Sequence, residues 1–156
     1  MKKHRIYADT SVFGGCHDEE FKRDSLEFIS ALRSKQFVLL ISEIVLRELE
    51  KAPPKVIAVL ESIPPETVES IDLTDEVLDL RDAYIEEGIL TPRWSDDAAH
   101  VAAATVARAD AIVSWNFSHI VRLDKMKAYN RVNLREGYGI LTIITPKEVV
   151  FDGGEE

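Results

Sequence analysis

Short apolar segments alternate with helix-like segments along most of the chain. The segments of strand length that are apolar or weakly alternating are residues 5–8, 37–41, 68–73, 111–115 and 140–144. The segments with helical spacing or helix-forming residues are 21–34, 43–51, 56–63, 77–85, 96–109 and 123–136. This alternation is typical of a mainly parallel sheet covered on both faces. It predicts an α/β fold, a three-layer α/β/α sandwich with a mainly parallel central sheet.

Polar, proline and glycine residues mark the expected ends of these elements. Ser42, Thr74 and Ser95 each stand where a helix is expected to begin, so they are candidate N-caps. Gly14 and Gly15 are expected to break the chain after the first strand. Residues 68–73 are expected to form an edge strand, since their alternation is weak.

The length of 156 residues fits one domain. We expect a single domain over residues 1–150, followed by a disordered tail over 151–156. Cys16 is the only cysteine, which excludes an internal disulfide and a zinc cluster made of thiolates. The sequence has neither the apolar core of a signal peptide nor a bilayer-length apolar run, and we therefore expect a cytoplasmic protein with no membrane association.

The formal net charge of −9 argues against a general nucleic-acid binder, because phosphate contacts need clustered lysine and arginine. Two interpretations are compatible with this charge. Acidic residues can be concentrated at a metal site, or the protein can act on RNA briefly and bind it weakly.

Asp9 directly follows the apolar segment 5–8, so its carboxylate is expected beyond the carboxyl end of the sheet, where α/β proteins bind ligands. The next residues, Thr10 and Ser11, offer hydroxyl groups to a phosphate or to the carboxylate. An aspartate at this place often only caps the next turn. Both interpretations stay open for Asp9 alone.

Glu48 lies in the predicted helix 43–51, whose inner face is expected to carry Val45, Leu46 and Leu49. It follows Val45 by three residues and therefore borders the apolar stripe. A carboxylate is costly to bury there unless it is paired or bound to a metal. The alternative is a boundary glutamate that reaches solvent.

Asp96 and Asp97 open an alanine-rich helix, where the helix dipole stabilises acidic side chains and suffices to explain one of them. Asp97 shares a helix face with Val101, and the alanines let this helix approach the sheet. We therefore expect Asp97 to point inward. His100 is expected to be packed or hydrogen-bonded rather than a metal ligand.

Ser114, Asn116 and His119 follow the segment 111–115, so they too are expected at the carboxyl edge of the sheet. Turn formation alone can explain Asn116. Carboxylates completed by water suit Mg²⁺ or Mn²⁺, whereas zinc is disfavoured by the lack of clustered histidine and cysteine.

Four segments in order resemble the PIN-domain nucleases, and among them the VapC-type toxins of toxin–antitoxin pairs: 7–11 (YADTS), 42–49 (SEIVLREL), 97–104 (DAAHVAAA) and 109–116 (ADAIVSWN). The resemblance runs from about residue 5 to 149. It implies a metal-dependent endoribonuclease that hydrolyses RNA phosphodiester bonds, a small antitoxin partner and a homodimer.

The family's metal-binding acids correspond to Asp9, Glu48 and Asp97. Its fourth position usually carries an acid, where this chain has Asn116, with His119 at the place of a second aspartate in many relatives. This departure leaves open whether one or two metal ions bind. The expected roles are catalytic for Asp9, Glu48, Asp97 and Asn116, metal-binding for the three acids, and supporting for Thr10, Ser11, Ser114 and His119. Asn116 is expected to hold a metal-bound water or the scissile phosphate.

The sequence also contains a basic stretch near its carboxyl end. The basic residues are Lys125, Lys127, Arg131 and Arg135, which can receive the RNA backbone or simply form a solvated helix face.

Two alternative functions stay open. Asn116 favours the first, a catalytically impaired PIN-like binding or assembly module. The second, a phosphotransfer or receiver domain, is less favoured because Ser11 stands where such phosphatases carry a second aspartate.

Overall fold

The computed structural model describes residues 2–149, so the tail expected over 151–156 lies outside the described residues. Its sheet has five parallel strands in the order β3-β2-β1-β4-β5. The strands are β1 (Arg5–Ala8), β2 (Val38–Ser42), β3 (Val68–Ile71), β4 (Ala111–Val113) and β5 (Thr142–Ile144). β3 is an edge strand, as its weak alternation predicts.

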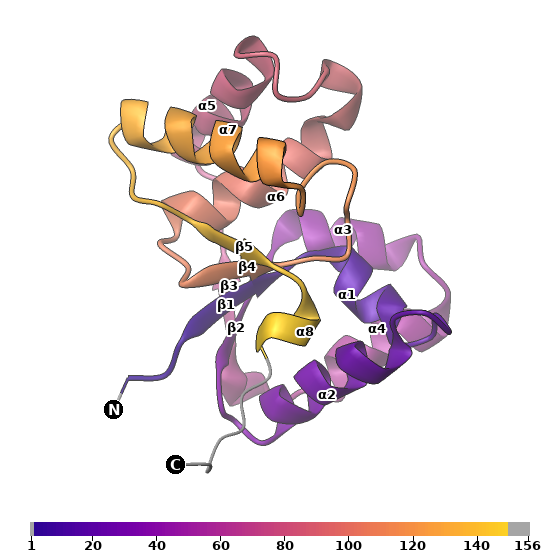
Figure 1. Ribbon diagram of the computed structural model, residues 1–156. Helices are drawn as coiled ribbons and strands as arrows, with labels where there is room; N and C mark the ends of the chain where they lie inside the picture. Colours follow the sequence, from indigo (N-terminus) through magenta and orange to yellow (C-terminus); the bar gives the residue numbers. More distant parts are fainter. Residues whose placement is uncertain (1, 150–156) are drawn as a thin grey trace.

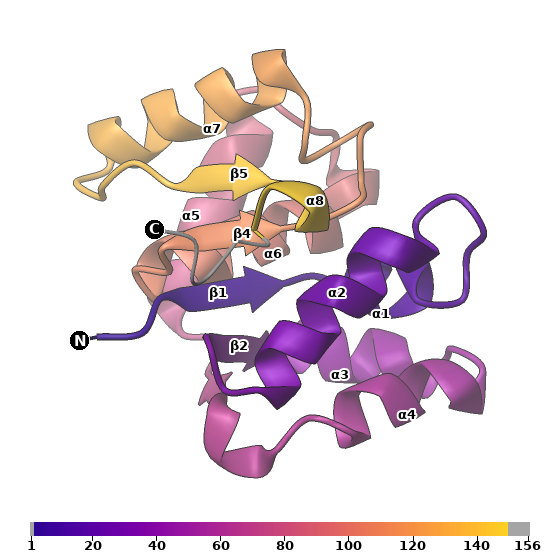
Figure 2. The ribbon, with the colours of Figure 1, turned by 60° about the horizontal axis from the view of Figure 1, so that its bottom comes forward.

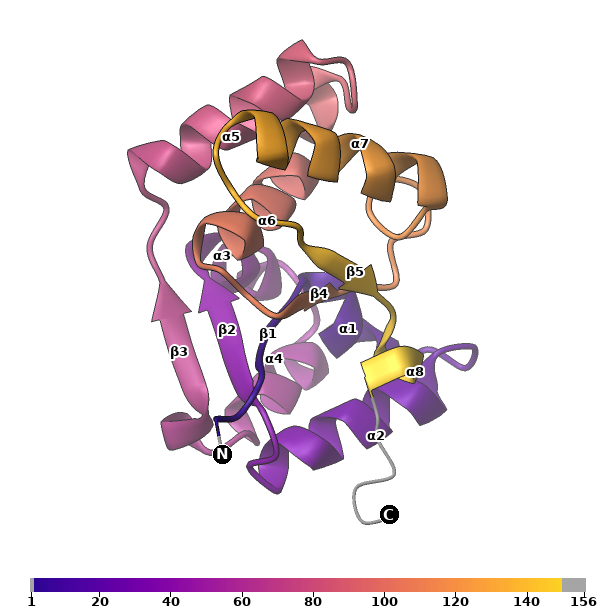
Figure 3. The same ribbon diagram turned by 60° about the vertical axis from the view of Figure 1, so that its left-hand side comes forward.

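Helices cover both faces of this sheet, which confirms the predicted three-layer α/β/α architecture (Figures 1 and 3). One layer holds α5 (Asp75–Glu86), α6 (Ser95–Val106) and α7 (Leu123–Arg135). The other holds α2 (Lys22–Arg33), α4 (Pro54–Glu61) and α8 (Pro146–Val149), as Figure 2 shows from below. Helices α1 (Thr10–Gly15) and α3 (Glu43–Glu50) directly follow β1 and β2, and the short 3-10 helices η1 (Pro65–Thr67) and η2 (Pro92–Trp94) precede β3 and α6.

The strand order makes β1 the point where the chain changes direction across the sheet. From β1 the chain proceeds outward through β2 to β3, then crosses back to β4 on the other side of β1. In open parallel sheets this arrangement leaves a crevice beyond the carboxyl ends of the strands, where ligands bind. Any site in this fold is therefore expected beyond β1 and β4.

Helix α6 is buried on nearly every side because its middle consists of small residues. Residues 98–105 are all buried, and five of them are alanine. Alanine has a short side chain and the highest helix propensity, so this helix can lie close to the sheet without losing stability. The alanine run thus holds the first turn of α6, with Asp97, at the carboxyl edge.

Three local expectations need correction. Gly14 and Gly15 do not break the chain but complete helix α1, because neither residue there needs a left-handed backbone. Helix α6 begins at Ser95 itself, so Trp94 occupies the N-cap and Ser95 is not a cap. Leu46 is 45% exposed, and Ile44 takes the inner face of α3 that the spacing assigned to Leu46.

The other two cap candidates differ from each other. The Val77 amide donates to the Thr74 hydroxyl over 3.3 Å, which confirms the predicted N-cap of α5. Ser42 does occupy the N-cap position of α3, but its hydroxyl makes no capping bond and instead contacts the Tyr7 hydroxyl. Over residues 2–149, no helix has the length and apolar character needed to cross a membrane.

Gly15 is a close-packing position, and its neighbour Gly14 supplies a matched control. A Cβ atom on Gly15 would lie 2.6 Å from Ser25 Oγ and 2.8 Å from Trp115 Nε1, two atoms that are themselves hydrogen-bonded. A Cβ on Gly14 would meet nothing within 4 Å. We expect Gly15→Ala to lower the free energy of unfolding by about 1–3 kcal/mol, and Gly14→Ala to be neutral or to raise it by about 0.5–1 kcal/mol.

Urea denaturation of the two variants beside the wild type measures this difference. Equal stability of both variants would contradict the packing assigned to Gly15.

Candidate active site

The residues expected to carry the chemistry meet at the carboxyl edge of the sheet. Asp9 follows β1, Ser114 follows β4, Glu48 comes from α3 and Asp97 from the first turn of α6. These four residues belong to separate segments of the chain, and the parallel strand order brings them to one edge. This is the edge at which the fold is expected to bind a ligand.

Asp9 is almost completely buried, with 4% of its surface exposed. Its carboxylate accepts hydrogen bonds from the hydroxyls of Ser11 at 2.6 Å and Ser114 at 2.7 Å. Burial raises the pKa of Asp9, and the nearby charge of Asp97 adds to this, whereas His100 and the two hydroxyls oppose it. The ionised form of Asp9 is therefore destabilised by its surroundings, and a cation would relieve this.

Glu48 is held on two sides. It accepts hydrogen bonds from His100 Nε2 at 2.9 Å and from the Thr10 hydroxyl. Burial acts to raise the pKa of Glu48, but the hydrogen bonds and the charge of His100 outweigh it, so the pKa lies below its ordinary value. Its side chain remains 32% exposed, which keeps the ionised carboxylate open to the crevice.

His100 lies buried between the acids, with 1% of its surface exposed. Its Nδ1 atom is 2.7 Å from the Tyr7 hydroxyl, which is in turn 2.7 Å from the Ser42 hydroxyl. Burial lowers the pKa of His100, but the hydrogen bond to Glu48 and the charges of Asp9, Glu48 and Asp97 raise it above the ordinary value. His100 is thus a packed, hydrogen-bonded residue, as predicted, and it stands close to all three carboxylates.

Asp97 is more buried than Asp96, as their positions around the helix predict. Asp97 is partly buried, and its carboxylate is 2.8 Å from His119 Nδ1, whereas Asp96 is exposed. His119 therefore reaches the site through its contact with Asp97.

The loop after β4 contributes Ser114 and Asn116 to the site, and the Asn116 backbone amide donates to the Ser114 hydroxyl. The Asn116 side-chain oxygen accepts the backbone amides of Ser118 and His119, the latter at 2.9 Å. Of the two sequence-based interpretations of Asn116, the structure thus supports turn formation. This turn sets the position of His119, which contacts Asp97.

The oxygen donors at this edge are of the kind that binds a divalent cation. Carboxylate oxygens with hydroxyls nearby are the ligands that Mg²⁺ and Mn²⁺ prefer, so the chemistry of the residues fits. The side-chain positions do not form a ready-made ligand set, because each carboxylate is bound to its own partners. Over residues 2–149, no group of three or more histidine, cysteine, aspartate or glutamate side chains could hold a metal ion as placed.

The four residues of the predicted basic stretch are spread along the length of α7. Lys125, near the start of the helix, lines a hollow beside His119. Arg135, at its other end, is bound to Glu87 and Glu136, away from the acids. Lys127 and Arg131 are exposed between them. Only Lys125 of these four is therefore brought to the acidic edge.

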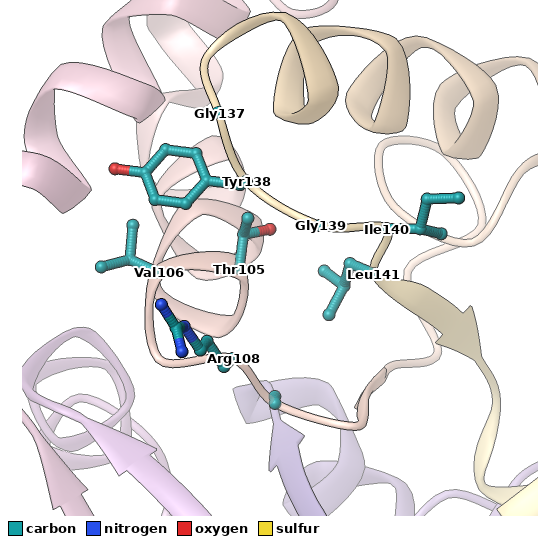
Figure 4. Close-up of a pocket in the computed structure, with 9 residues that line it drawn as sticks. Thr105, Val106, Arg108, Gly137, Tyr138, Gly139, Ile140 and Leu141 are labelled. Carbon is teal, nitrogen blue, oxygen red and sulfur yellow. The ribbon is translucent and has the colours of Figure 1, made fainter.

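Another hollow lies away from the acidic edge. It has a volume of about 480 Å³ and is formed by the end of α6 and the loop between α7 and β5, as Figure 4 shows. Its lining includes Ala109, which precedes β4, so it opens at the amino ends of the strands. Arg108 is the only charged residue among those that line it. This hollow is separate from the acidic edge.

Comparison with known proteins supports the fold. No protein-family model and no curated protein sequence matches the chain. Among solved structures, the chain is similar to Mycobacterium tuberculosis VapC20, a sarcin-ricin loop cleaving toxin, with a TM-score of 0.51 and 16% sequence identity over 73% of this chain and 92% of that one. At this identity the likeness shows a shared fold, and it confirms at that level the sequence-based resemblance to VapC-type toxins.

Proposed function

We propose that this chain, which shares the fold of VapC20, is a PIN-domain endoribonuclease that depends on Mg²⁺ or Mn²⁺. The observation that carries the proposal is the meeting of Asp9, Glu48 and Asp97 around buried His100 at the edge where this fold binds ligands. Because crowded carboxylates repel one another, a binding cation would make their ionised forms favourable together.

Asp9, Glu48 and Asp97 would hold the metal ion in this proposal. When bound, the ion would supply positive charge for the transition state of phosphodiester hydrolysis and make a water molecule more acidic. Glu48, fixed by His100 and Thr10, would orient the attacking water. In the hydrolysis, the water oxygen would form the new bond to phosphorus while the bond to the leaving ribose oxygen breaks, the attacking water would lose its proton to solvent, and solvent would protonate the leaving oxygen.

Further residues would support these acids. Ser11 and Ser114 fix the buried Asp9 carboxylate, and His119 does the same for Asp97. Asn116 acts through the turn that carries His119. Lys125 would contact an RNA phosphate near this edge, and Lys127 and Arg131 would follow the strand further along α7; Arg135 has its charge already paired.

The resemblance to toxin–antitoxin proteins extends the proposal to a protein partner, an oligomeric state and a place of action. We propose a small antitoxin protein that blocks the acidic edge, a homodimer, and action in the cytoplasm. The similarity to VapC20 supports the toxin assignment. Copurification with the product of an adjacent small reading frame, and sedimentation of the purified chain, would test the partner and the dimer.

Metal binding is expected to stabilise the folded protein. A ligand that binds the folded state alone, at about 100 times its dissociation constant, adds about 2.7 kcal/mol to the free energy of unfolding. We therefore expect the melting temperature to rise with Mn²⁺ relative to EDTA, and RNA cleavage to require the same ion. Asp9→Asn serves as the control that loses both effects. A wild-type protein that folds but shows neither effect would contradict the proposal.

One observation favours a second candidate, a PIN-like module without catalysis. The separate hydrogen bonding of the three carboxylates, together with Asn116 at a position where the family usually carries an acid, would fit a binding or assembly role. The same cleavage assay separates the candidates. RNA cleavage that is lost in Asp9→Asn excludes the module.

A further inference from the structure

An exposed tryptophan stands next to the acidic edge. Trp94 ends η2, immediately before α6, and 38% of its surface is exposed. The chain has one other tryptophan, Trp115, which stacks on Phe21 at a ring distance of 4.3 Å and donates to the Ser25 hydroxyl. Trp115 thus has a packing role, whereas nothing in the packing of the core calls for Trp94 at its position.

Trp94 connects to the acids through one residue. Its ring centroid lies 4.4 Å from that of His119, and His119 Nδ1 lies 2.8 Å from the Asp97 carboxylate. The Arg93 guanidinium lies over the Trp94 ring at 4.8 Å. Indole, imidazole and guanidinium groups are the planar groups on which proteins stack unpaired RNA bases. Trp94 and His119 therefore make a stacking platform beside Asp97, and Arg93 covers one face of the Trp94 ring.

The platform borders a hollow of about 370 Å³. Besides Trp94 and His119, the residues that line it include Leu90 and the basic residues Arg122 and Lys125. Lys125 Nζ donates to the Ile89 carbonyl at 2.5 Å, which leaves its other hydrogens free to face a ligand. The volume lies within the range of about 300–1,000 Å³ that is typical of small-molecule pockets. A planar ring flanked by an anionic phosphate matches these surroundings.

We infer that this hollow binds a nucleobase of the RNA strand, stacked on Trp94, and so places the neighbouring phosphodiester at Asp97. The inference deepens the proposed function and rests on it. It also explains how a chain with a net charge of −9 can hold RNA. Stacking needs no excess of positive charge, whereas binding through the phosphate backbone does.

The test measures binding of a short labelled single-stranded RNA by fluorescence anisotropy, in the Asp9→Asn background to prevent cleavage. Trp94→Leu is expected to weaken binding by about 5- to 100-fold, the range for the loss of one stacked base. Trp94→Phe keeps an aromatic ring and is expected to retain most of the affinity. Because the lost contact is not ionic, the salt dependence of binding is expected to stay unchanged in Trp94→Leu.

Phe117→Leu is the matched control. Phe117 is 48% exposed and lies near the Phe21 and Trp115 rings, outside the residues that line the hollow. Its replacement is expected to change affinity by less than about twofold, since it removes no stacked base. An equal loss in both leucine variants would overturn the inference, because the effect would then not be specific to the hollow.

Intrinsic fluorescence gives a second readout that needs no catalysis. Trp115 is stacked on Phe21, hydrogen-bonded to Ser25 and outside the residues that line the hollow, so adenosine monophosphate is expected to quench Trp94 emission in the parent protein and to lose this effect in Trp94→Phe. Cleavage by the wild type with unchanged RNA affinity in Trp94→Leu overturns the nucleobase site alone. If the wild type does not cleave RNA with either metal, the proposed function fails, and the inference fails with it.

Discussion

Replacing Asp9 by asparagine is expected to reduce metal-dependent RNA cleavage by at least about 100-fold, because several kcal/mol of transition-state stabilisation would depend on the bound ion. The same change is expected to leave the melting temperature in EDTA equal or higher. Burial raises the pKa of Asp9, so the ionised carboxylate opposes folding at neutral pH. A neutral amide removes this cost and still hydrogen-bonds with Ser11 and Ser114.

Cleavage rates with Mn²⁺ and melting curves in EDTA check the two parts of this prediction. Asp97→Asn is expected to lose cleavage in the same way, whereas Asp96→Asn serves as its control, because Asp96 sits exposed in the same helical turn. Wild-type cleavage by Asp9→Asn would remove Asp9 from the mechanism.

Replacing His100 by leucine is expected to have the second-largest effect. Residues that orient a metal ligand typically contribute about 10- to 100-fold to affinity or activity, and His100 orients Glu48. The loss of its two buried hydrogen bonds is expected to lower the free energy of unfolding by about 1–3 kcal/mol. His100→Gln, which keeps an amide donor for Glu48, is expected to retain more activity.

The stability effect of His100 has a defined pH dependence. Because the acids raise the pKa of His100 above its ordinary value of 6.5, the protonated ring stabilises the folded state. This contribution is fully present below pH 6.5 and is lost as the pH rises through the folded-state pKa. Urea denaturation in EDTA should therefore show a larger difference between wild type and His100→Leu at mildly acid than at alkaline pH. A difference that grows with pH would contradict this assignment.

The alternation of apolar and helical segments was sufficient to predict the sheet, its edge strand β3 and the edge at which the acids gather. Asp9 and Asp97 could be located because strand ends and helix faces follow from short-range periodicity. The helix α1 could not be predicted from a pair of glycines, since Gly15 is needed there for the close approach of Trp115 and Ser25, residues distant in the sequence.

Other features of the site depend on contacts that no local pattern encodes. Ile44 rather than Leu46 lies on the inner face of α3. The link from Ser42 through Tyr7 to His100 joins three segments, and its serine looked like an ordinary cap. The hollow beside Trp94 is lined in part by Leu90 and Arg122, which the sequence gives no reason to associate with Asp97.

Each of the three carboxylates has hydrogen-bond partners of its own within the protein. This has a consequence for the order of folding and the proposed metal binding. Many small metalloproteins remain unfolded until their metal ion binds, because the free energy of metal binding is needed to fold them. Here serine, threonine and histidine side chains already satisfy each acid, so newly made chains can reach their final shape before any ion is present. Folding of the polypeptide and the proposed binding of the metal ion would thus be two separate events in time.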